Sequence, residues 1–159
     1  EVVHLREGTV DGGDVMRVGS TLFVGKSTRT DQLGVDALRE VCEPLGIRCE
    51  EVPVKSGLHL KSACTVVDAE TLVVLPSVLD TTFFEGFGIR LIEVSEAFGA
   101  NVLPMGKTIL VSASAPITEA RLKAEGYETV TVDVSELHKA DGALTCLSLR
   151  WAQPGAWCP

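Results

Sequence analysis

The feature of this sequence that most constrains its fold is a threefold recurrence of one pattern. In each copy, two short apolar runs joined by a turn precede a helix-like stretch and a third apolar run. In the first copy a hairpin is predicted over 13–24, an amphipathic helix from Asp31 and a strand over 47–54. A single doubly wound sheet would place one strand, not two, before each helix. The recurrence, at intervals of roughly 40–50 residues, therefore predicts an α/β fold of repeated ββαβ modules.

The second and third copies follow the same order. Their predicted elements are hairpins, helices and strands over 63–75, 77–87 and 89–94, then 101–112, 114–126 and 129–134. The third helix has the clearest boundary signals, with Ser114 as candidate N-cap and Pro116 in its first turn. One further strand is predicted over 144–151. No linker or low-complexity segment separates the copies, so a single structural body is expected.

Composition narrows the class of ligand. The 159 residues include 14 Lys and Arg against 22 Asp and Glu, which gives a net charge of −8. Nucleic acids and anionic membrane surfaces require clustered positive charge, so neither is an expected partner. The longest strongly apolar stretch, 72–79, is far shorter than the ~20 residues that span a bilayer. A small cationic ligand fits this composition better.

The cysteine and histidine spacings exclude other classes of chemistry. The five cysteines form an odd set without a CxxC pair, which favours a reducing compartment and hence a cytoplasmic protein. His138 is not part of an HxxxH or similar metal-binding pattern. Gly12 and Gly13 precede a predicted strand and not a helix, so they do not form a nucleotide-binding turn. We therefore expect neither a metal nor a cofactor.

Three residues could together carry nucleophilic catalysis. Cys146 supplies a thiol, which needs an imidazole or an electropositive neighbourhood to become a thiolate, and His59 supplies an imidazole. Asp11 supplies a carboxylate of the kind that orients such a histidine. Each also has an ordinary structural interpretation: Cys146 as a small buried residue, His59 as a half-buried ring, and Asp11 as a turn former.

Five segments in order along the chain decide between these interpretations: DGGDVMRVG, GKSTRTD, GLHLKS, GANVLPM and DGALTCLSLRW. Together they resemble the dimethylarginine dimethylaminohydrolase family of the guanidino-group-modifying superfamily. The resemblance implies a five-bladed α/β propeller of ββαβ modules, hydrolysing Nω-methylated L-arginine to L-citrulline and methylamine or dimethylamine. It also implies that Cys146 is the nucleophile, that His59 is the general acid and base, and that Asp11 orients His59.

The same resemblance implies residues that bind the substrate. Arg29 matches the arginine that grips the α-carboxylate, and the loop with Ala140 and Asp141 matches the one whose carbonyls receive the α-amino group. Deiminases of unsubstituted guanidines resemble this pattern but have an acidic residue two positions after the histidine, where this chain has Lys61. A hydrolase of methylated arginine is therefore preferred. The alternatives are a related enzyme, such as an arginine deiminase or a citrulline hydrolase, and a noncatalytic propeller-derived binding module.

The chain departs from the family pattern in length. A five-bladed propeller needs five modules, whereas the sequence holds about three and the predicted closing strand. Residues 1–159 are therefore expected to be the C-terminal portion of one catalytic domain. The expected partners are the N-terminal half of the enzyme, on the same or a separate chain, and a small cationic amino acid; a homodimer is left open. In the family, the absent part supplies the acidic residues that bind the guanidinium.

Overall fold

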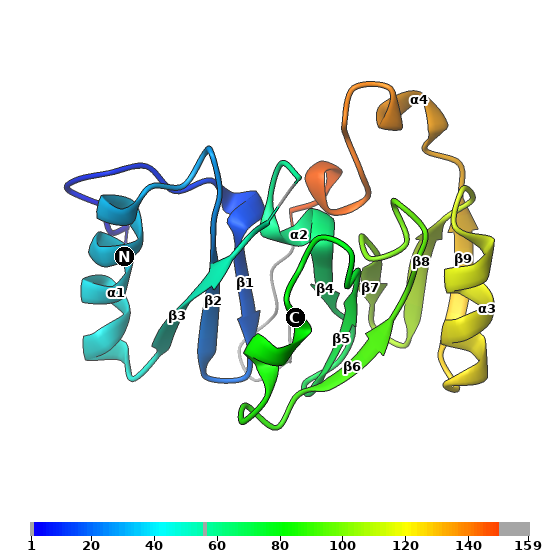
Figure 1. Ribbon diagram of the computed structural model, residues 1–159, viewed down its shortest axis with the longest axis horizontal. Helices are drawn as coiled ribbons and strands as arrows, with labels where there is room; N and C mark the ends of the chain where they lie inside the picture. Colours follow the sequence, from blue (N-terminus) through cyan, green and yellow to red (C-terminus); the bar gives the residue numbers. More distant parts are fainter. Residues whose placement is uncertain (1, 56, 150–159) are drawn as a thin grey trace.

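The computed structural model describes residues 2–55 and 57–149, and within them three sheets of three strands follow one another along the chain (Figure 1). In each sheet the first two strands are antiparallel and the third pairs in parallel with the second. The strands are β1 (Val15–Val18), β2 (Thr21–Lys26) and β3 (Arg48–Pro53); β4 (Cys64–Val66), β5 (Thr71–Val74) and β6 (Arg90–Glu93); and β7 (Leu103–Met105), β8 (Thr108–Ser112) and β9 (Glu128–Val132).

A crossover segment joins the second and third strands of each module, as parallel pairing requires. These segments contain α1 (Gln32–Cys42), the 3₁₀ helix η3 (Thr81–Phe84) and α3 (Pro116–Ala124). Helix α1 begins one residue after the predicted Asp31, which is its N-cap: the Asp31 carboxylate accepts a hydrogen bond from the Gly34 N–H at 2.8 Å. The predicted ββαβ repeats of an α/β propeller are confirmed.

Two predicted helix boundaries are wrong. Within 77–87 only Thr81–Phe84 is helical, because Phe83, Phe84 and Phe87 form an aromatic cluster with Phe23 of the first module. The residue before α3 is Ala115 and not Ser114. Instead, Glu96 caps this helix from another segment: its carboxylate accepts hydrogen bonds from the first free N–H groups of α3 at 3.1 and 2.6 Å.

The strand predicted over 144–151 is also wrong for its described part. Thr145–Leu147 form a 3₁₀ helix, η4, in which the Cys146 N–H donates to the carbonyl of Ala143. The Asn101 side chain hydrogen-bonds to both the backbone N–H and the side-chain hydroxyl of Thr145. These two hydrogen bonds replace the pairing that a strand would make with its neighbour. Arg150 and Trp151 lie outside the described residues.

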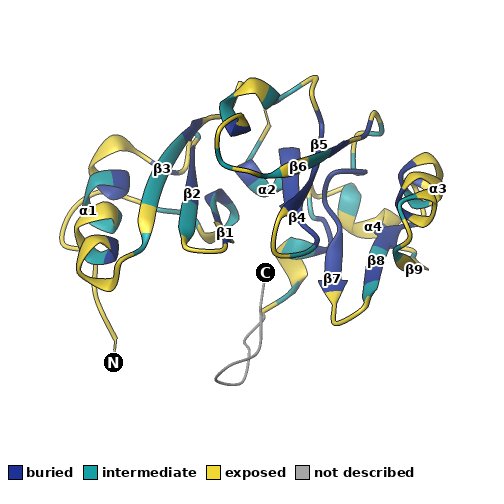
Figure 2. Cartoon of the chain, turned by 90° about the horizontal axis from the view of Figure 1, so that it is seen from below, coloured by how far each residue is buried: buried dark blue, intermediate teal, exposed yellow. Residues whose placement is uncertain are grey.

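The apolar core lies between the modules. One cluster joins the first and second modules around Phe23, Leu60 and Phe84, and another joins the second and third around Ile92, Val111 and Leu122. Figure 2 shows the buried strands β4, β5 and β7 near the centre of the chain, with exposed surface on α1 and α3 at its two ends. The modules therefore pack side by side.

Among the described residues, no helix combines the length and the apolar character needed to cross a membrane.

Candidate active site

Asp11 and His59 meet at the edge where the first two modules join. Asp11 caps the 3₁₀ helix η1 (Gly12–Asp14) with its side chain. His59 occupies the N-cap position of the short helix α2 (Leu60–Ala63), and its ring makes no hydrogen bond to that helix. The His59 Nε2 lies 3.2 Å from the Asp11 Oδ1, a close polar contact that is not well aligned as a hydrogen bond. Gly13 makes this approach feasible, because a Cβ there would lie 2.6 Å from the imidazole Cγ. The second glycine of the DGGD motif thus provides the surface on which the imidazole lies.

The Asp11 carboxylate is also held in its ionised form. Its Oδ1 accepts a hydrogen bond from the Gly13 N–H at 2.8 Å, and the Arg29 Nη1 lies 4.0 Å from its Oδ2. The Gly13 N–H is the main cause that holds the pKa of Asp11 below its ordinary value. His59 and Arg29 act in the same direction, against partial burial. Asp11 therefore faces the imidazole as a carboxylate through the neutral and mildly acidic range.

Cys146 faces the same space as this pair. It lies on η4 with an exposed side chain, and it lines a cavity of about 340 Å³ together with Asp11, Gly13 and His59. The structure thus brings together the three residues predicted for nucleophilic catalysis, although Asp11 and His59 are separated from Cys146 by most of the chain. A thiol, an imidazole and an ionised carboxylate on one cavity are the groups that covalent catalysis requires.

The predicted substrate-binding residues do not line this cavity. Arg29 reaches the site through its contact with Asp11, but it is not among the described residues that line the cavity. Ala140 and Asp141 lie in the turn between α4 (Ser135–His138) and η4, and they do not line it either. Asp141 has a φ of 55°, a left-handed conformation that is uncommon for a residue with a side chain. Its N–H donates to the carbonyl of His138, which keeps the turn tight.

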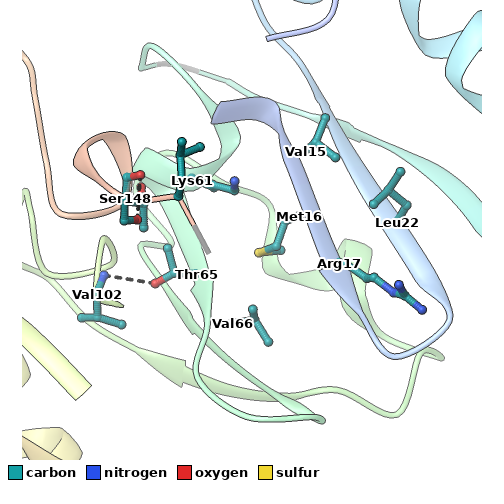
Figure 3. A pocket seen from close by; sticks show the side chains of 11 residues that line it. Val15, Met16, Arg17, Leu22, Lys61, Thr65, Val66, Val102 and Ser148 are labelled. Carbon is teal, nitrogen blue, oxygen red and sulfur yellow. Dashed lines mark hydrogen bonds between the residues drawn. The ribbon is translucent and has the colours of Figure 1, made fainter. Parts of the chain in front are cut away.

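A second cavity continues from the first. Its volume is about 370 Å³, and it shares Lys61, Thr145, Ser148 and Leu149 with the site (Figure 3). The Lys61 ammonium donates a hydrogen bond to the carbonyl of Gly12 at 2.9 Å. A cationic side chain therefore stands at the junction of the two cavities, beside the turn that carries Asp11.

Sequence reasoning missed Asp14, the last residue of the DGGD motif. Its side chain is fully buried and accepts three hydrogen bonds, from the Ser27 Oγ at 2.6 Å, the Thr30 Oγ1 at 2.7 Å and the Leu60 N–H at 2.9 Å. It therefore holds together the segments that carry Arg29 and His59. The only available signal was an acidic residue next to an apolar strand, which is weak without knowledge of its partners.

We expect Cys146 to be alkylated faster than the other described cysteines. Burial raises the pKa of the Cys42 and Cys64 thiols and raises that of Cys49 to about 11, so these thiolates are scarce near neutral pH. Cys146 is the exposed cysteine among the described residues. Peptide mapping by mass spectrometry after brief treatment with a haloacetamidine measures the difference, with the Cys158 peptide counted separately. Equal labelling of all sites would contradict a reactive nucleophile and favour a noncatalytic module.

Comparison with known proteins agrees with the fold. A family model described as arginine deiminase matches residues 2–93. The dimethylarginine dimethylaminohydrolase of Streptomyces coelicolor is 42% identical over 144 residues, or 90% of this chain and 55% of that protein. The Pseudomonas aeruginosa protein of the same name is 31% identical over 91% of this chain and 57% of its own length. The solved structure of a cysteine-to-serine mutant of the latter, complexed with citrulline, aligns with a TM-score of 0.81 at 27% identity and covers 92% of this chain and 57% of that one.

The fold and these relatives define an α/β propeller of the guanidino-group-modifying superfamily. The chain belongs to the arginine deiminase family. The resemblance to the dimethylarginine dimethylaminohydrolases that the sequence motifs indicated is confirmed. The chain spans about half the length of the curated relatives that it matches.

Proposed function

We propose that this chain supplies the nucleophile and the acid–base group of an enzyme that hydrolyses Nω-methylated L-arginine to L-citrulline and methylamine or dimethylamine. The observation that carries the proposal is the common cavity of Cys146, His59 and the ionised Asp11. The names of the two relatives support it, as does the citrulline held by the P. aeruginosa protein. The chemistry is hydrolysis of a C–N bond, and it requires only side chains and water.

The reaction proceeds in two halves. In the first, the Cys146 thiolate attacks the guanidinium carbon and forms a C–S bond, while His59 gives a proton to the departing methylamine nitrogen as its C–N bond breaks. In the second, His59 takes a proton from water, and the resulting hydroxide attacks the same carbon. The C–S bond then breaks to return the thiolate, and the added hydroxyl loses its proton to solvent to become the carbonyl of citrulline. Asp11 keeps the imidazole oriented and stabilises its protonated form. The carbon retains its oxidation state throughout.

Substrate recognition is proposed to use the remaining predicted residues. Arg29 binds the α-carboxylate, since its guanidinium can offer two parallel hydrogen bonds. The carbonyls of Ala140 and Asp141 receive the α-amino group. Lys61 occupies the position where deiminases of unsubstituted guanidines have a carboxylate, and its ammonium is committed to the carbonyl of Gly12. With Lys61 at this position, the enzyme has no second carboxylate there to bind the substrate's guanidinium. A methylated guanidinium has fewer N–H donors and needs fewer carboxylate contacts, so Lys61 supports a methylated substrate.

Replacing Arg29 by lysine is expected to raise KM by about 10- to 100-fold, because a charge-assisted hydrogen bond is lost from the bound substrate. The change in kcat should be small, since Arg29 does not touch the reacting carbon. Steady-state kinetics with dimethylarginine measure both constants. The decarboxylated analogue of dimethylarginine is the control substrate and should not distinguish the variant from the parent. A fall in kcat at unchanged KM would contradict this role.

The chain is proposed to act as the C-terminal part of a single propeller domain. The N-terminal modules, on the same or another polypeptide, complete the site with the acidic residues that bind the guanidinium. Both parts together make up the full-length enzyme. A cytoplasmic location is proposed because the four cysteines of the described residues are free thiols, as expected in a reducing compartment.

The decisive experiment is a substrate panel for the full-length enzyme. Asymmetric dimethylarginine, arginine, agmatine and citrulline are supplied separately, and the amine and citrulline products are quantified. Dimethylamine and citrulline in equal amounts from dimethylarginine are the expected result. Ammonia from arginine as the main product would instead assign a deiminase, and ammonia from citrulline would assign a citrulline hydrolase.

A further inference from the structure

Asn101 connects the segment of the proposed nucleophile to the segment of the proposed acid–base group. It lies just before β7, and only 2% of its surface is exposed. Its amide nitrogen donates hydrogen bonds to the Lys61 carbonyl and to the Thr145 Oγ1, both at 2.8 Å. Its amide oxygen accepts a hydrogen bond from the Thr145 N–H at 3.0 Å. One side chain thus contacts the residue next to Cys146 and a residue of the helix that directly follows His59.

These contacts allow only one orientation of the amide. Both N–H groups of the Asn101 amide donate a hydrogen bond, and its carbonyl oxygen accepts one. A rotation that exchanged oxygen and nitrogen would turn the oxygen towards the Lys61 carbonyl and the NH₂ group towards the Thr145 N–H. Both pairings are repulsive. The side chain therefore acts as a fixed link between the two segments.

The link matters because Thr145 directly precedes Cys146 on η4 and is held at two points by Asn101. On the other side, the Lys61 carbonyl belongs to α2, the helix that directly follows His59. The Asn101 amide therefore connects the segment of the thiol to the segment of the imidazole through hydrogen bonds at both of its ends.

We infer that Asn101 is a positioning residue, which sets the distance and orientation between the Cys146 thiol and the His59 imidazole. This inference rests on the proposed function and adds to it a residue that lines the same cavity and whose amide is fully used by hydrogen bonds to Lys61 and Thr145. A displacement of about 1 Å between reacting groups can cost roughly 10²-fold in rate. Loss of the link should therefore lower kcat, while KM changes little because Arg29 and its segment are not touched.

The test uses two variants of the full-length enzyme. Asn101→Asp keeps an acceptor for the Thr145 N–H but turns a second oxygen towards the Lys61 carbonyl, so it breaks the link on the His59 side. Asn101→Leu has a similar volume, carries no charge and breaks the link on both sides. Both are expected to lower kcat by about 10²-fold with little change in KM. If only the aspartate variant were impaired, its added charge would explain the loss and the inference would be overturned.

Tyr127→Phe is the matched control. The Tyr127 hydroxyl also ties two modules together, since it donates to Asp68 and accepts a hydrogen bond from Arg90, but it does not line either of the two cavities. This variant should lower the melting temperature without lowering kcat. An equal loss of kcat in Tyr127→Phe would show that any weakened contact between modules impairs turnover, and it would overturn a specific role for Asn101.

A second readout does not depend on turnover. The rate of Cys146 alkylation at neutral pH, relative to its rate at high pH where exposed thiols are ionised, reports how the imidazole influences the thiol. The Asn101 variants are expected to lower this ratio and Tyr127→Phe to leave it unchanged. If the parent enzyme processed none of the compounds in the substrate panel, the proposed function would be wrong. The ratio of Cys146 alkylation rates would still test whether Asn101 connects the two segments. An unchanged ratio in both Asn101 variants would refute the inference.

Discussion

Replacing Cys146 by serine in the full-length enzyme is expected to lower kcat by about 10⁴-fold or more. A serine hydroxyl is a far weaker nucleophile than a thiolate, and a single imidazole that is arranged for a thiol does not compensate for this. The fold should be unaffected, because the side chain is exposed and the contacts of η4 involve the backbone of Cys146 and the side chain of Thr145. Citrulline formation and thermal melting measure the two effects separately.

Cys49→Ser is the control for this substitution. Cys49 is partly buried on β3, and burial raises the pKa of its thiol to about 11, which makes it a poor nucleophile at neutral pH. Its replacement should leave kcat unchanged. Turnover that survived in Cys146→Ser would rule out a covalent intermediate on this residue. The pair of variants therefore separates loss of the nucleophile from a general effect of removing a cysteine.

The repeated modules could be predicted because their signals are local. Gly19 and Gly106 adopt the positive φ that their tight turns require, and apolar runs on either side of each turn form the hairpins. The amphipathic pattern of α1 and its Asp31 cap are likewise contained in the segment itself. Fold class can be deduced from such short-range patterns once they recur.

The wrong predictions share a physical cause. The segment 77–87 does not form a regular helix because its phenylalanines pack against Phe23, which lies more than 50 residues earlier. The apolar run that begins at Leu144 has the composition of a strand. Because Asn101 hydrogen-bonds to Thr145, the chain forms a 3₁₀ turn there instead. Contacts between distant segments override local propensity in both places, and local sequence patterns do not reveal those contacts.

The candidate site divides in the same way. Asp11, His59 and Cys146 could be proposed because their side chains have recognisable chemistry, and the family resemblance selected them from other Asp, His and Cys residues. Side-chain type does not distinguish Asp14 and Asn101 from other Asp and Asn residues, and their importance lies in hydrogen bonds to residues 46 and 44 positions away along the chain. Residues that hold a site together are therefore the ones that only the structure identifies.

Replacing Asp14 by alanine is expected to destabilise the full-length enzyme and to impair turnover together. The buried Leu60 N–H loses its acceptor and cannot turn elsewhere, which costs about 1–3 kcal/mol of unfolding free energy. The Ser27 and Thr30 hydroxyls also lose the carboxylate to which they donate. Chemical denaturation and steady-state kinetics on the same preparation measure the two effects.

The loss of turnover is expected because these hydroxyls in turn hold the site. The Thr30 Oγ1 accepts a hydrogen bond from the Asp11 N–H at 3.1 Å, and the Ser27 Oγ accepts one from the Arg29 N–H at 3.0 Å. Asp14 is thus connected to the backbone of Asp11 and Arg29, and through Leu60 to the helix that directly follows His59. Its removal frees the imidazole, its carboxylate partner and the arginine proposed to bind the substrate at once, so kcat should fall and KM should rise.

Asp14→Asn separates the Leu60 contact from the two hydroxyl contacts. Its amide oxygen retains the acceptor for the Leu60 N–H, but its NH₂ group cannot accept from the Ser27 and Thr30 hydroxyls. A smaller loss of stability and turnover than in alanine is therefore expected for asparagine. An alanine variant as stable and as active as the parent would show that the three segments hold their positions without the buried carboxylate. A defect in asparagine as severe as in alanine would mean that the hydroxyl contacts, and not the Leu60 contact, organise this edge of the site.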